Sequence, residues 1–284
     1  MSRELTQWLA ETGHGDIVER HPLSGGDICQ TELIRTSTGE DLCIKQEPSA
    51  PDHFFEAEAT GLRAIAATDC IRVPQVYTVT HSFIALEYIE PSGTGGHYWE
   101  RLGEQLAALH AQPVPGFGFT GDNFCGRTPQ PNPHTQDGYR FFADYRLRYQ
   151  AGMALEYGRL SEAEVEAIER LCERLPSLIP VQPPSLIHGD LWVGNIHSDP
   201  DGNPVLIDPA AHWGWAEAEL AMTRLFGGFH PRFYQAYLAH RPLAPDWESR
   251  VPLYNLYHLL NHLNLFGSSY HPQIVSVLNR YTQV

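Results

Sequence analysis

The sequence has no long apolar run and few basic residues. No stretch approaches the roughly 20 apolar residues of a membrane-spanning helix, and the polar start from Met1 to Gly15 lacks the pattern of a signal peptide. The chain has 19 basic against 34 acidic residues, a formal net charge of −15. This acidity argues against nucleic acid or an anionic membrane as a partner. It suits a cationic substrate, although acidity that serves only solubility explains it equally well. We expect a cytoplasmic protein.

Cysteine pairs and the common nucleotide-binding motifs are also missing. The cysteine count is odd, and no two cysteines lie within four residues of each other, which excludes a Cys-x-x-Cys motif and argues against a disulfide framework. These cysteines are Cys29, Cys43, Cys70, Cys125 and Cys172. There is no His-Glu-x-x-His zinc signature, no Gly-x-x-x-x-Gly-Lys-Ser/Thr loop and no Gly-x-Gly-x-x-Gly fingerprint. A Gly-x-Ser-x-Gly nucleophile elbow is absent as well.

The first ninety residues predict a strand-rich unit that carries one helix. Two short strands are expected over residues 27–35 and 41–46, and a helix rich in Ala and Glu over residues 52–67. Two further strands are expected over residues 75–80 and 83–88.

Beyond a Pro- and Gly-rich joint at residues 91–96, the pattern becomes mainly helical. Apolar residues recur at helical spacing from Trp99, and again behind a capping-box start at Ser161. Residues 112–137 are rich in Pro and Gly and predict an irregular insertion. We therefore predict an α+β, two-lobed fold, with an N-terminal lobe of residues 1–89, a C-terminal lobe of residues 90–284 and a cleft between them.

The pattern with the clearest chemistry is His-x-Asp-x-x-x-x-Asn from His188 to Asn195, followed by a strand that ends at Asp208. Phosphoryl transfer to a hydroxyl needs a carboxylate that orients the acceptor, here Asp190, and oxygen ligands for Mg²⁺. A turn at residues 199–203 would bring Asp208 beside Asn195. An Asp-x-x-x-x-Asn spacing alone is common, and an Asp after a strand is often a turn former. The two together, with His two residues before the first Asp, are typical of kinases. His188 is interpreted as a structural support for the loop.

The N-terminal unit supplies candidates for holding phosphates. Gly25 and Gly26 open the first strand pair and could place backbone N–H groups over phosphates. Lys45, on the second strand, could reach the phosphates if a carboxylate of the next helix pairs with it. Glu56 and Glu58 lie on different faces of that helix, and we favour Glu58. The alternative is an exposed lysine and solvated glutamates.

Together these residues resemble the fructosamine/ketosamine-3-kinase family. The resemblance extends over nearly the whole chain, and its most specific blocks are C-terminal. The matching blocks are Thr128-Pro129-Gln130 with Asn132, Phe141-Phe142 with Arg146-Leu147, the loop from His188 to Asn195, Asp208-Pro209-Ala210 through Glu217 and Glu219 to Met222, Phe226-Gly227-Gly228-Phe229, and the run from Tyr257 to Gly267.

The resemblance implies a protein-kinase-like fold related to the aminoglycoside phosphotransferases, which binds ATP between its lobes. It implies phosphorylation of the 3-hydroxyl of a ketosamine, either small or protein-bound. The resemblance also implies roles for single residues. Asp190 would accept the proton, Asn195 and Asp208 would bind Mg²⁺, and Lys45 would contact the phosphates. Glu219 would support the catalytic loop. The joint that meets adenine would be Glu87-Tyr88-Ile89. We also expect a monomer.

Several questions stay open on the sequence alone. His134 and Gly138 stand where family members often carry tryptophan, which puts the substrate range in question. A kinase for an aminoglycoside or a choline-like amine, and a catalytically silent nucleotide-binding protein of the same fold, remain alternatives. His258 and His262 are four residues apart, but no third metal ligand is evident nearby, so packing is the preferred interpretation. Cys29, next to the candidate phosphate loop, is interpreted as a small residue that fills a strand position.

Overall fold

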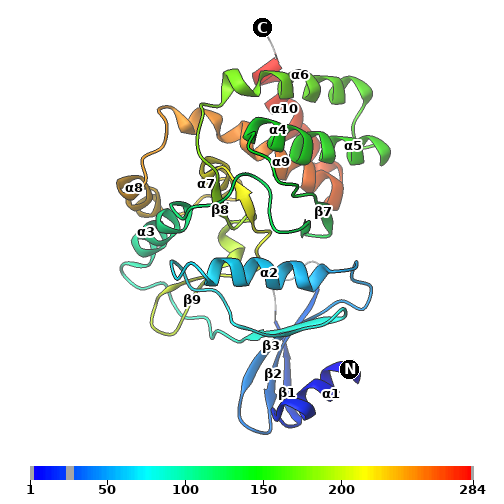
Figure 1. Ribbon diagram of the computed structural model, residues 1–284, viewed down its shortest axis with the longest axis vertical. Helices are drawn as coiled ribbons and strands as arrows, with labels where there is room; N and C mark the ends of the chain where they lie inside the picture. Colours follow the sequence, from blue (N-terminus) through cyan, green and yellow to red (C-terminus); the bar gives the residue numbers. More distant parts are fainter. Residues whose placement is uncertain (1–2, 24–28, 283–284) are drawn as a thin grey trace.

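A computed structural model describes residues 3–23 and 29–282 of the chain, and in it one five-stranded antiparallel sheet organises the N-terminal part (Figure 1). The strand order is β1-β2-β3-β5-β4. The strands are β1 (Ile17–Pro22), β2 (Gln30–Thr36), β3 (Asp41–Gln46), β4 (Val76–Val79) and β5 (Phe83–Glu87). The predicted bounds of β3 match the observed ones, and the strands predicted at 75–80 and 83–88 agree with β4 and β5 to within one residue. The strand predicted at 27–35 ends one residue before β2 does, and its first two residues lie outside the described residues.

Helices cover both faces of this sheet. Leu5 and Leu9 of α1 (Arg3–Thr12) pack in a core with Ile44 and the other buried side chains of one face. On the other face lies α2 (Phe54–Ala66), which contributes Phe55, Leu62 and their neighbours to a second core. The prediction of a single helix in this unit was wrong. Leu5, Trp8 and Leu9 of α1 stand at helical spacing, so the sequence did carry a signal for this helix.

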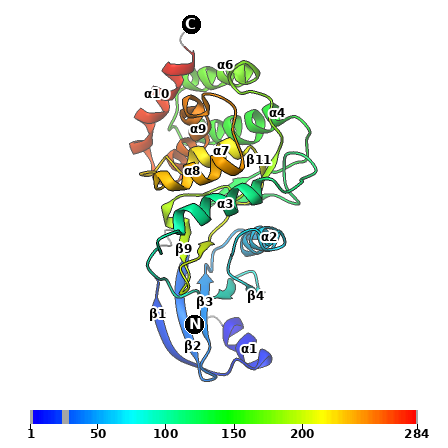
Figure 2. The same ribbon diagram turned by 90° about the vertical axis from the view of Figure 1, so that its left-hand side faces the viewer.

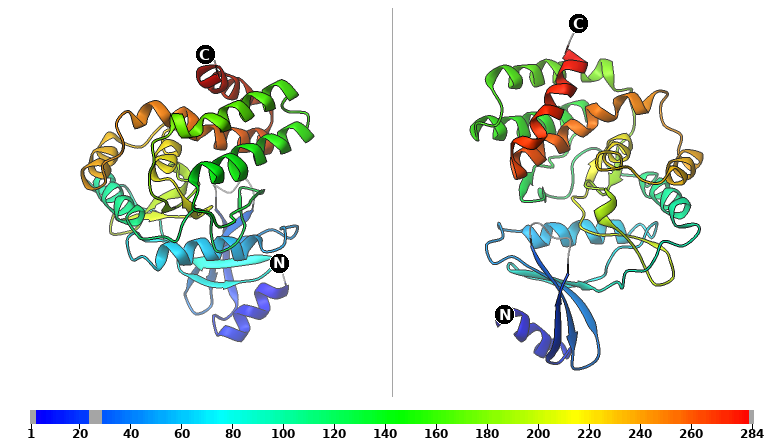
Figure 3. Two further views of the ribbon diagram at one scale, coloured as in Figure 1. Left: turned by 45° about the horizontal axis from the view of Figure 1, so that its top comes forward. Right: turned by 180° about the vertical axis from the view of Figure 1, so that it is seen from behind.

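The C-terminal part is mainly helical, and its helices lie at the end of the molecule opposite the sheet (Figure 3). The apolar stripe predicted behind Ser161 is buried there, and the capping box at Ser161 and Glu164 is confirmed. The stripe predicted from Trp99 instead joins the core that α2 contributes to. A π-helical segment, Ala143–Arg148, joins α4 to α5. The helices are α3 (Tyr98–His110), α4 (Gly138–Phe142), α5 (Tyr149–Glu156), α6 (Glu162–Leu178), α7 (Ala216–Met222), α8 (Pro231–His240), α9 (Trp247–Phe266) and α10 (His271–Thr282).

Three small antiparallel strand pairs lie between the sheet and these helices. They are β6 (Asn123–Cys125) with β7 (Thr128–Gln130), β8 (Ser185–Ile187) with β11 (His212–Gly214), and β9 (Ile196–Ser198) with β10 (Pro204–Leu206). The predicted irregular insertion at residues 112–137 thus contains a hairpin. The hairpin of β9 and β10 descends toward the sheet, where the amide of Leu206 donates to the carbonyl of Arg72 at 3.0 Å (Figure 2).

The strand-rich and helical parts agree with the predicted two-lobed α+β architecture, whereas a boundary between residues 89 and 90 stays a prediction. Across the described ranges, 3–23 and 29–282, no helix has both the length and the apolar character that a bilayer crossing requires.

Candidate functional site

The loop that follows β8 carries Asp190 and ends in a short 3₁₀ turn, Val193–Asn195. The side-chain amide nitrogen of Asn195 donates to the backbone carbonyl of Asp190 at 2.8 Å and to its carboxylate at 3.2 Å. The amide of Ile207 in turn donates to the carbonyl of Asn195 at 3.1 Å, so the hairpin places Asp208 next to the loop as predicted. Asp190, Asn195 and Asp208 therefore lie next to one another in the structure.

A buried carboxylate at the start of α7 braces this loop. Glu219 accepts from the amides of His188 and Gly189 at 3.0 and 2.7 Å, and its carboxylate lies 2.8 Å from the ring of His110. Burial opposes the charge, but hydrogen bonding from His110 and the neighbouring backbone holds the pKa of Glu219 below its usual value. Glycine is required at position 189, where φ is +84° and a Cβ would lie 2.1 Å from the carbonyl oxygen of Ala210.

His188 links the start of the Asp190 loop to the residue that precedes Asp208. Its Nε2 lies 2.8 Å from the carbonyl oxygen of Ile207, and its Nδ1 accepts from the amide of Asp190 at 3.3 Å. This pattern requires the neutral tautomer that carries its proton on Nε2. Burial lowers the pKa of His188, which keeps the ring neutral. The side chain is fully buried, so its position agrees with the predicted structural role.

Lys45 of β3 reaches across the cleft and pairs with two carboxylates. Its Nζ lies 2.5 Å from Oε1 of Glu58 and also contacts Oδ1 of Asp208. Burial opposes the charge of Lys45, but these two carboxylates outweigh it and raise the pKa above its usual range. Of the two candidate glutamates, Glu58 is thus the one beside Lys45. Asp208 itself has a φ of +56°, a backbone conformation that costs energy for any residue other than glycine.

A cleft of about 420 Å³ connects these groups. Lys45, Glu58, Asp190, Asn195 and Asp208 all line it. The predicted adenine joint, Glu87-Tyr88-Ile89, is not part of this lining, and the carboxylate of Glu87 pairs with Arg72 at 2.7 Å. An adenine contact by the backbone of this segment stays a prediction. Gly25 and Gly26 lie outside the described residues.

Asp190 has an environment that suits proton transfer. Burial, reinforced by the negative charge of Asp208, raises the pKa of Asp190 to about 7. A carboxylate with such a pKa can accept a proton from an acceptor hydroxyl and release it again near neutral pH.

The residues present fit a magnesium ion beside Asp190. The nitrogen of the Asn195 side chain is already committed to Asp190, which leaves the amide oxygen as the ligand atom. The carboxylate of Asp208 is the second hard oxygen donor, and its side chain is 37% exposed to the cleft. Mg²⁺ prefers ligands of this kind together with phosphate oxygens and water.

Aromatic side chains form a wall along the cleft, and of these the sequence suggested only Trp192 and His262 as the edge of an acceptor pocket. They come from the start of α2, the β6–β7 hairpin, the loop after Asp190, the segment between α7 and α8, the end of α9 and the 3₁₀ turn after it. The wall consists of Phe54, Phe124, Trp192, Phe226, His262, Phe266 and Tyr270. Trp192 and Phe226 make an edge contact with ring centroids 5.9 Å apart. The two ends of the wall lie far apart along the chain, and only the fold brings them together. A signal was present in the family-like blocks around Phe226 and after Tyr257.

His134 and Gly138 lie away from the cleft lining. The ring of His134 packs against Trp213, with centroids 4.9 Å apart. A Cβ on Gly138 would lie 2.5 Å from Phe117 and 2.7 Å from Trp215, so a larger side chain has no room there. Gly138 is buried and serves packing, whereas His134 is exposed beside Trp213, and neither residue lines the cleft.

Comparison with known proteins agrees with this geometry. The model of the fructosamine kinase family matches residues 1–283. A Synechocystis protein named "Probable ketoamine kinase" is 40% identical over 94% of this chain and 92% of its own length. The chloroplastic protein-ribulosamine 3-kinase of Oryza sativa subsp. indica is 37% identical over 99% of this chain and 84% of its own length.

Solved structures show the same fold. A crystal structure from Thermobifida fusca, assigned as a fructosamine-3-kinase, has a TM-score of 0.91 at 32% identity and covers the whole of both chains. A choline kinase from Streptococcus pneumoniae has a TM-score of 0.69 at 16% identity, covering 98% of this chain and 99% of its own. At that identity the likeness establishes the fold alone.

Proposed function

The chain belongs to the fructosamine kinase family, and from that membership we propose that it transfers the γ-phosphoryl group of ATP to the 3-hydroxyl of a ketosamine. The observation that carries the proposal is the meeting of Lys45, Asp190, Asn195 and Asp208 in one cleft. A catalytically silent protein of this fold would not need all four groups in this arrangement. We further propose that the protein acts as a cytoplasmic monomer.

On this proposal the nucleotide is held from the sheet side of the cleft. Lys45, positioned by Glu58, would contact the phosphates, and its second partner Asp208 would turn to the metal. Asn195 and Asp208 would hold Mg²⁺, which offsets the negative charge of the phosphates. The backbone of residues 87–89 would meet the adenine ring.

The acceptor would enter from the helical side. Aromatic faces such as Trp192 and Phe226 suit the apolar face of a sugar ring, and the net charge of −15 favours a protonated amine on that sugar. Asp190 would hold the 3-hydroxyl and accept its proton, because its raised pKa makes it basic enough near neutral pH.

A phosphate-transfer assay across ketosamines, free sugars and aminoglycosides tests this proposal. We expect a fructose- or ribulose-amine to be phosphorylated on O3 with kcat/KM at least about tenfold above free fructose, or ~1.4 kcal/mol of discrimination. Strong preference for an aminoglycoside, or phosphate on a terminal hydroxyl, would contradict the assignment. No magnesium-dependent transfer to any acceptor would favour the silent protein.

A further inference from the structure

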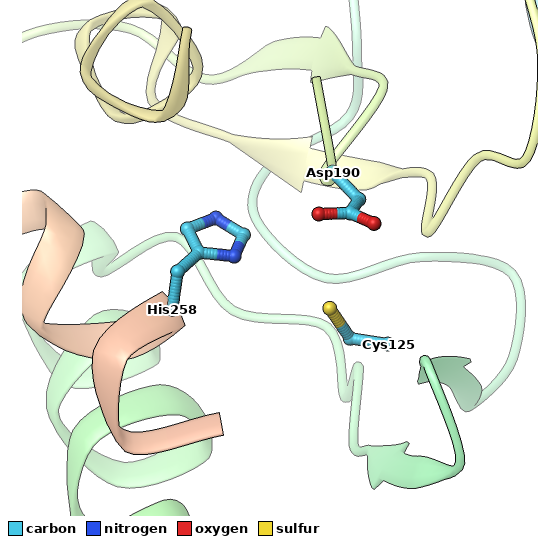
Figure 4. A group of neighbouring side chains, drawn as sticks. All are labelled: Cys125, Asp190 and His258. Atoms are coloured by element: carbon cyan, nitrogen blue, oxygen red, sulfur yellow. The ribbon is translucent and has the colours of Figure 1, made fainter. Parts of the chain in front are cut away.

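Three potential metal ligands from distant parts of the chain converge at the wall of the cleft (Figure 4). They are the thiol of Cys125 at the end of β6, the carboxylate of Asp190 and the imidazole of His258 in α9. One ligand atom from each lies within 4.8 Å of the other two. Cys125 and His258 are only 2% and 6% exposed, so this is a buried cluster that meets solvent through Asp190 and the cleft.

One ring nitrogen of His258 has no hydrogen-bond partner among the described residues. This atom, Nδ1, is buried, which is costly for a polar atom without a partner unless something binds it. Burial, with smaller contributions from His262 and Arg146, lowers the pKa of His258 to about 3. The ring is therefore neutral, and a nitrogen lone pair is available to a ligand. Figure 4 shows the ring directed toward Asp190 and Cys125.

The donor set differs from the proposed magnesium site. A thiolate, an imidazole and a carboxylate are ligands for Zn²⁺ or Co²⁺, whereas Mg²⁺ takes oxygen donors. Tetrahedral zinc bonds of about 2.0–2.3 Å place donor atoms roughly 3.3–3.8 Å apart, a separation that small side-chain rotations could reach from this arrangement. Cys125 and Asp190 both line the cleft, so the fourth position would face solvent or substrate.

Neighbouring groups limit how tightly this cluster can bind a cation. The side-chain amide of Asn261 donates to Cys125 Sγ at 3.2 Å, and the positive charge of buried Arg146 acts on both Cys125 and His258. Burial raises the pKa of Cys125, so an ion must displace the thiol proton to solvent as it binds. We expect weaker, reversible binding than at a structural zinc site.

We propose that Cys125, Asp190 and His258 form a site for a thiophilic divalent cation such as Zn²⁺, and that the bound ion inhibits the enzyme. Inhibition would follow because Asp190 cannot orient an acceptor hydroxyl while it is a metal ligand. Zinc should therefore compete with the sugar acceptor and not with the nucleotide. The inhibition rests on the proposed function, whereas the binding of the ion does not.

Binding is tested with Co²⁺ on the full chain in the presence of saturating Mg²⁺. A sulfur-to-cobalt charge-transfer band reports a cysteine ligand, and cobalt held only by oxygen donors such as Asn195 and Asp208 would not produce it. We expect one equivalent of Co²⁺ to produce the band, Cys125→Ser to abolish it, and His258→Gln to weaken binding by about tenfold or more. Cys29 is a second cysteine in the cleft. The Cys29→Ser variant is therefore the matched control and should retain the band. Absence of the band, or a band that depends on Cys29, would overturn the site.

Inhibition is tested by titrating Zn²⁺ into the kinase assay at saturating Mg·ATP, with each variant compared with its own zinc-free rate. We expect a chelator to reverse the inhibition, a higher ketosamine concentration to relieve it, and Cys125→Ser and His258→Gln to be at least about tenfold less sensitive. Equal sensitivity of all variants, or relief by ATP alone, would overturn the inhibitory role. If the chain had no kinase activity, the cobalt spectrum would still decide whether the site exists.

Discussion

Replacing Lys45 by methionine tests the balance of charge in the cleft. Methionine keeps the length of the side chain but removes the ammonium group that lies between Glu58 and Asp208. The side chains of Lys45 and Glu58 are only 10% and 14% exposed, so water replaces the lost partner poorly. Breaking a buried ion pair by removing one partner costs about 3–5 kcal/mol. Burial raises the pKa of Glu58, so Glu58 can take up a proton and reduce this cost.

We therefore expect Lys45→Met to lower the free energy of unfolding by about 2–4 kcal/mol at pH 8. The loss should be smaller at pH 5.5, because a larger fraction of Glu58 is then protonated and needs no partner. Urea unfolding of the protein without metal and nucleotide measures both values. Steady-state kinetics should also show a higher KM for ATP, because Lys45 is proposed to contact the phosphates.

A double-mutant cycle separates the ion pair from other effects of the substitution. Glu58→Gln alone leaves Lys45 paired with Asp208, and the double variant removes both members of the pair. The coupling energy should be about 1.5–3 kcal/mol. Arg35 and Asp41 of the same sheet provide the control, since their side chains are 46% and 30% exposed and such a pair couples by only about 0.2–1 kcal/mol. Equal coupling in the two cycles would refute the reasoning.

Three further predictions concern single groups of the cleft. Asp190→Asn should lower kcat by roughly 10² or more with little change in nucleotide affinity; near-normal turnover of the folded variant would rule out the proposed mechanism. Asp208→Ala should weaken binding of Mg·ATP more than binding of metal-free ADP, as calorimetry can measure, and equal effects would make Asp208 structural. Burial raises the pKa of Cys29 to about 11, so iodoacetamide at pH 8 should alkylate it about 100-fold more slowly than a free cysteine; mass spectrometry would detect a faster reaction.

The sequence predicted local elements better than long-range contacts. The bounds of β3 and the capping box at Ser161 were predicted correctly, because alternation and capping chemistry act over a few neighbouring residues. The first helix was missed although Leu5, Trp8 and Leu9 stand at helical spacing. The hairpin of β6 and β7 lies in a Pro- and Gly-rich stretch, where no local pattern indicates it.

The same limit applies to the cleft. Asp190, Asn195 and Asp208 were predicted together because one hairpin joins them, and Lys45 with Glu58 because a strand and the next helix are adjacent. No third ligand is evident in the sequence near His258 and His262, because Cys125 and Asp190, which lie beside His258 in the fold, belong to other elements. His262 instead faces the backbone, with its Nδ1 2.7 Å from the carbonyl oxygen of His258.

The carboxylates of Asp190 and Asp208 owe their positions to groups that do not line the cleft. Gly189, next to Asp190, has a φ of +84°, and Asp208 has a φ of +56°, so both aspartates lie at left-handed turns of the backbone. Such a conformation costs a non-glycine residue of order 1–3 kcal/mol and persists only where the surroundings enforce it. Two buried side chains supply that constraint, since Glu219 binds the amides before Asp190 and His188 links the amide of Asp190 to the carbonyl of Ile207. The hydrogen bonds of Glu219 and His188 therefore hold the backbone that leads to Asp190 and the backbone next to Asp208, while their own side chains stay outside the cleft.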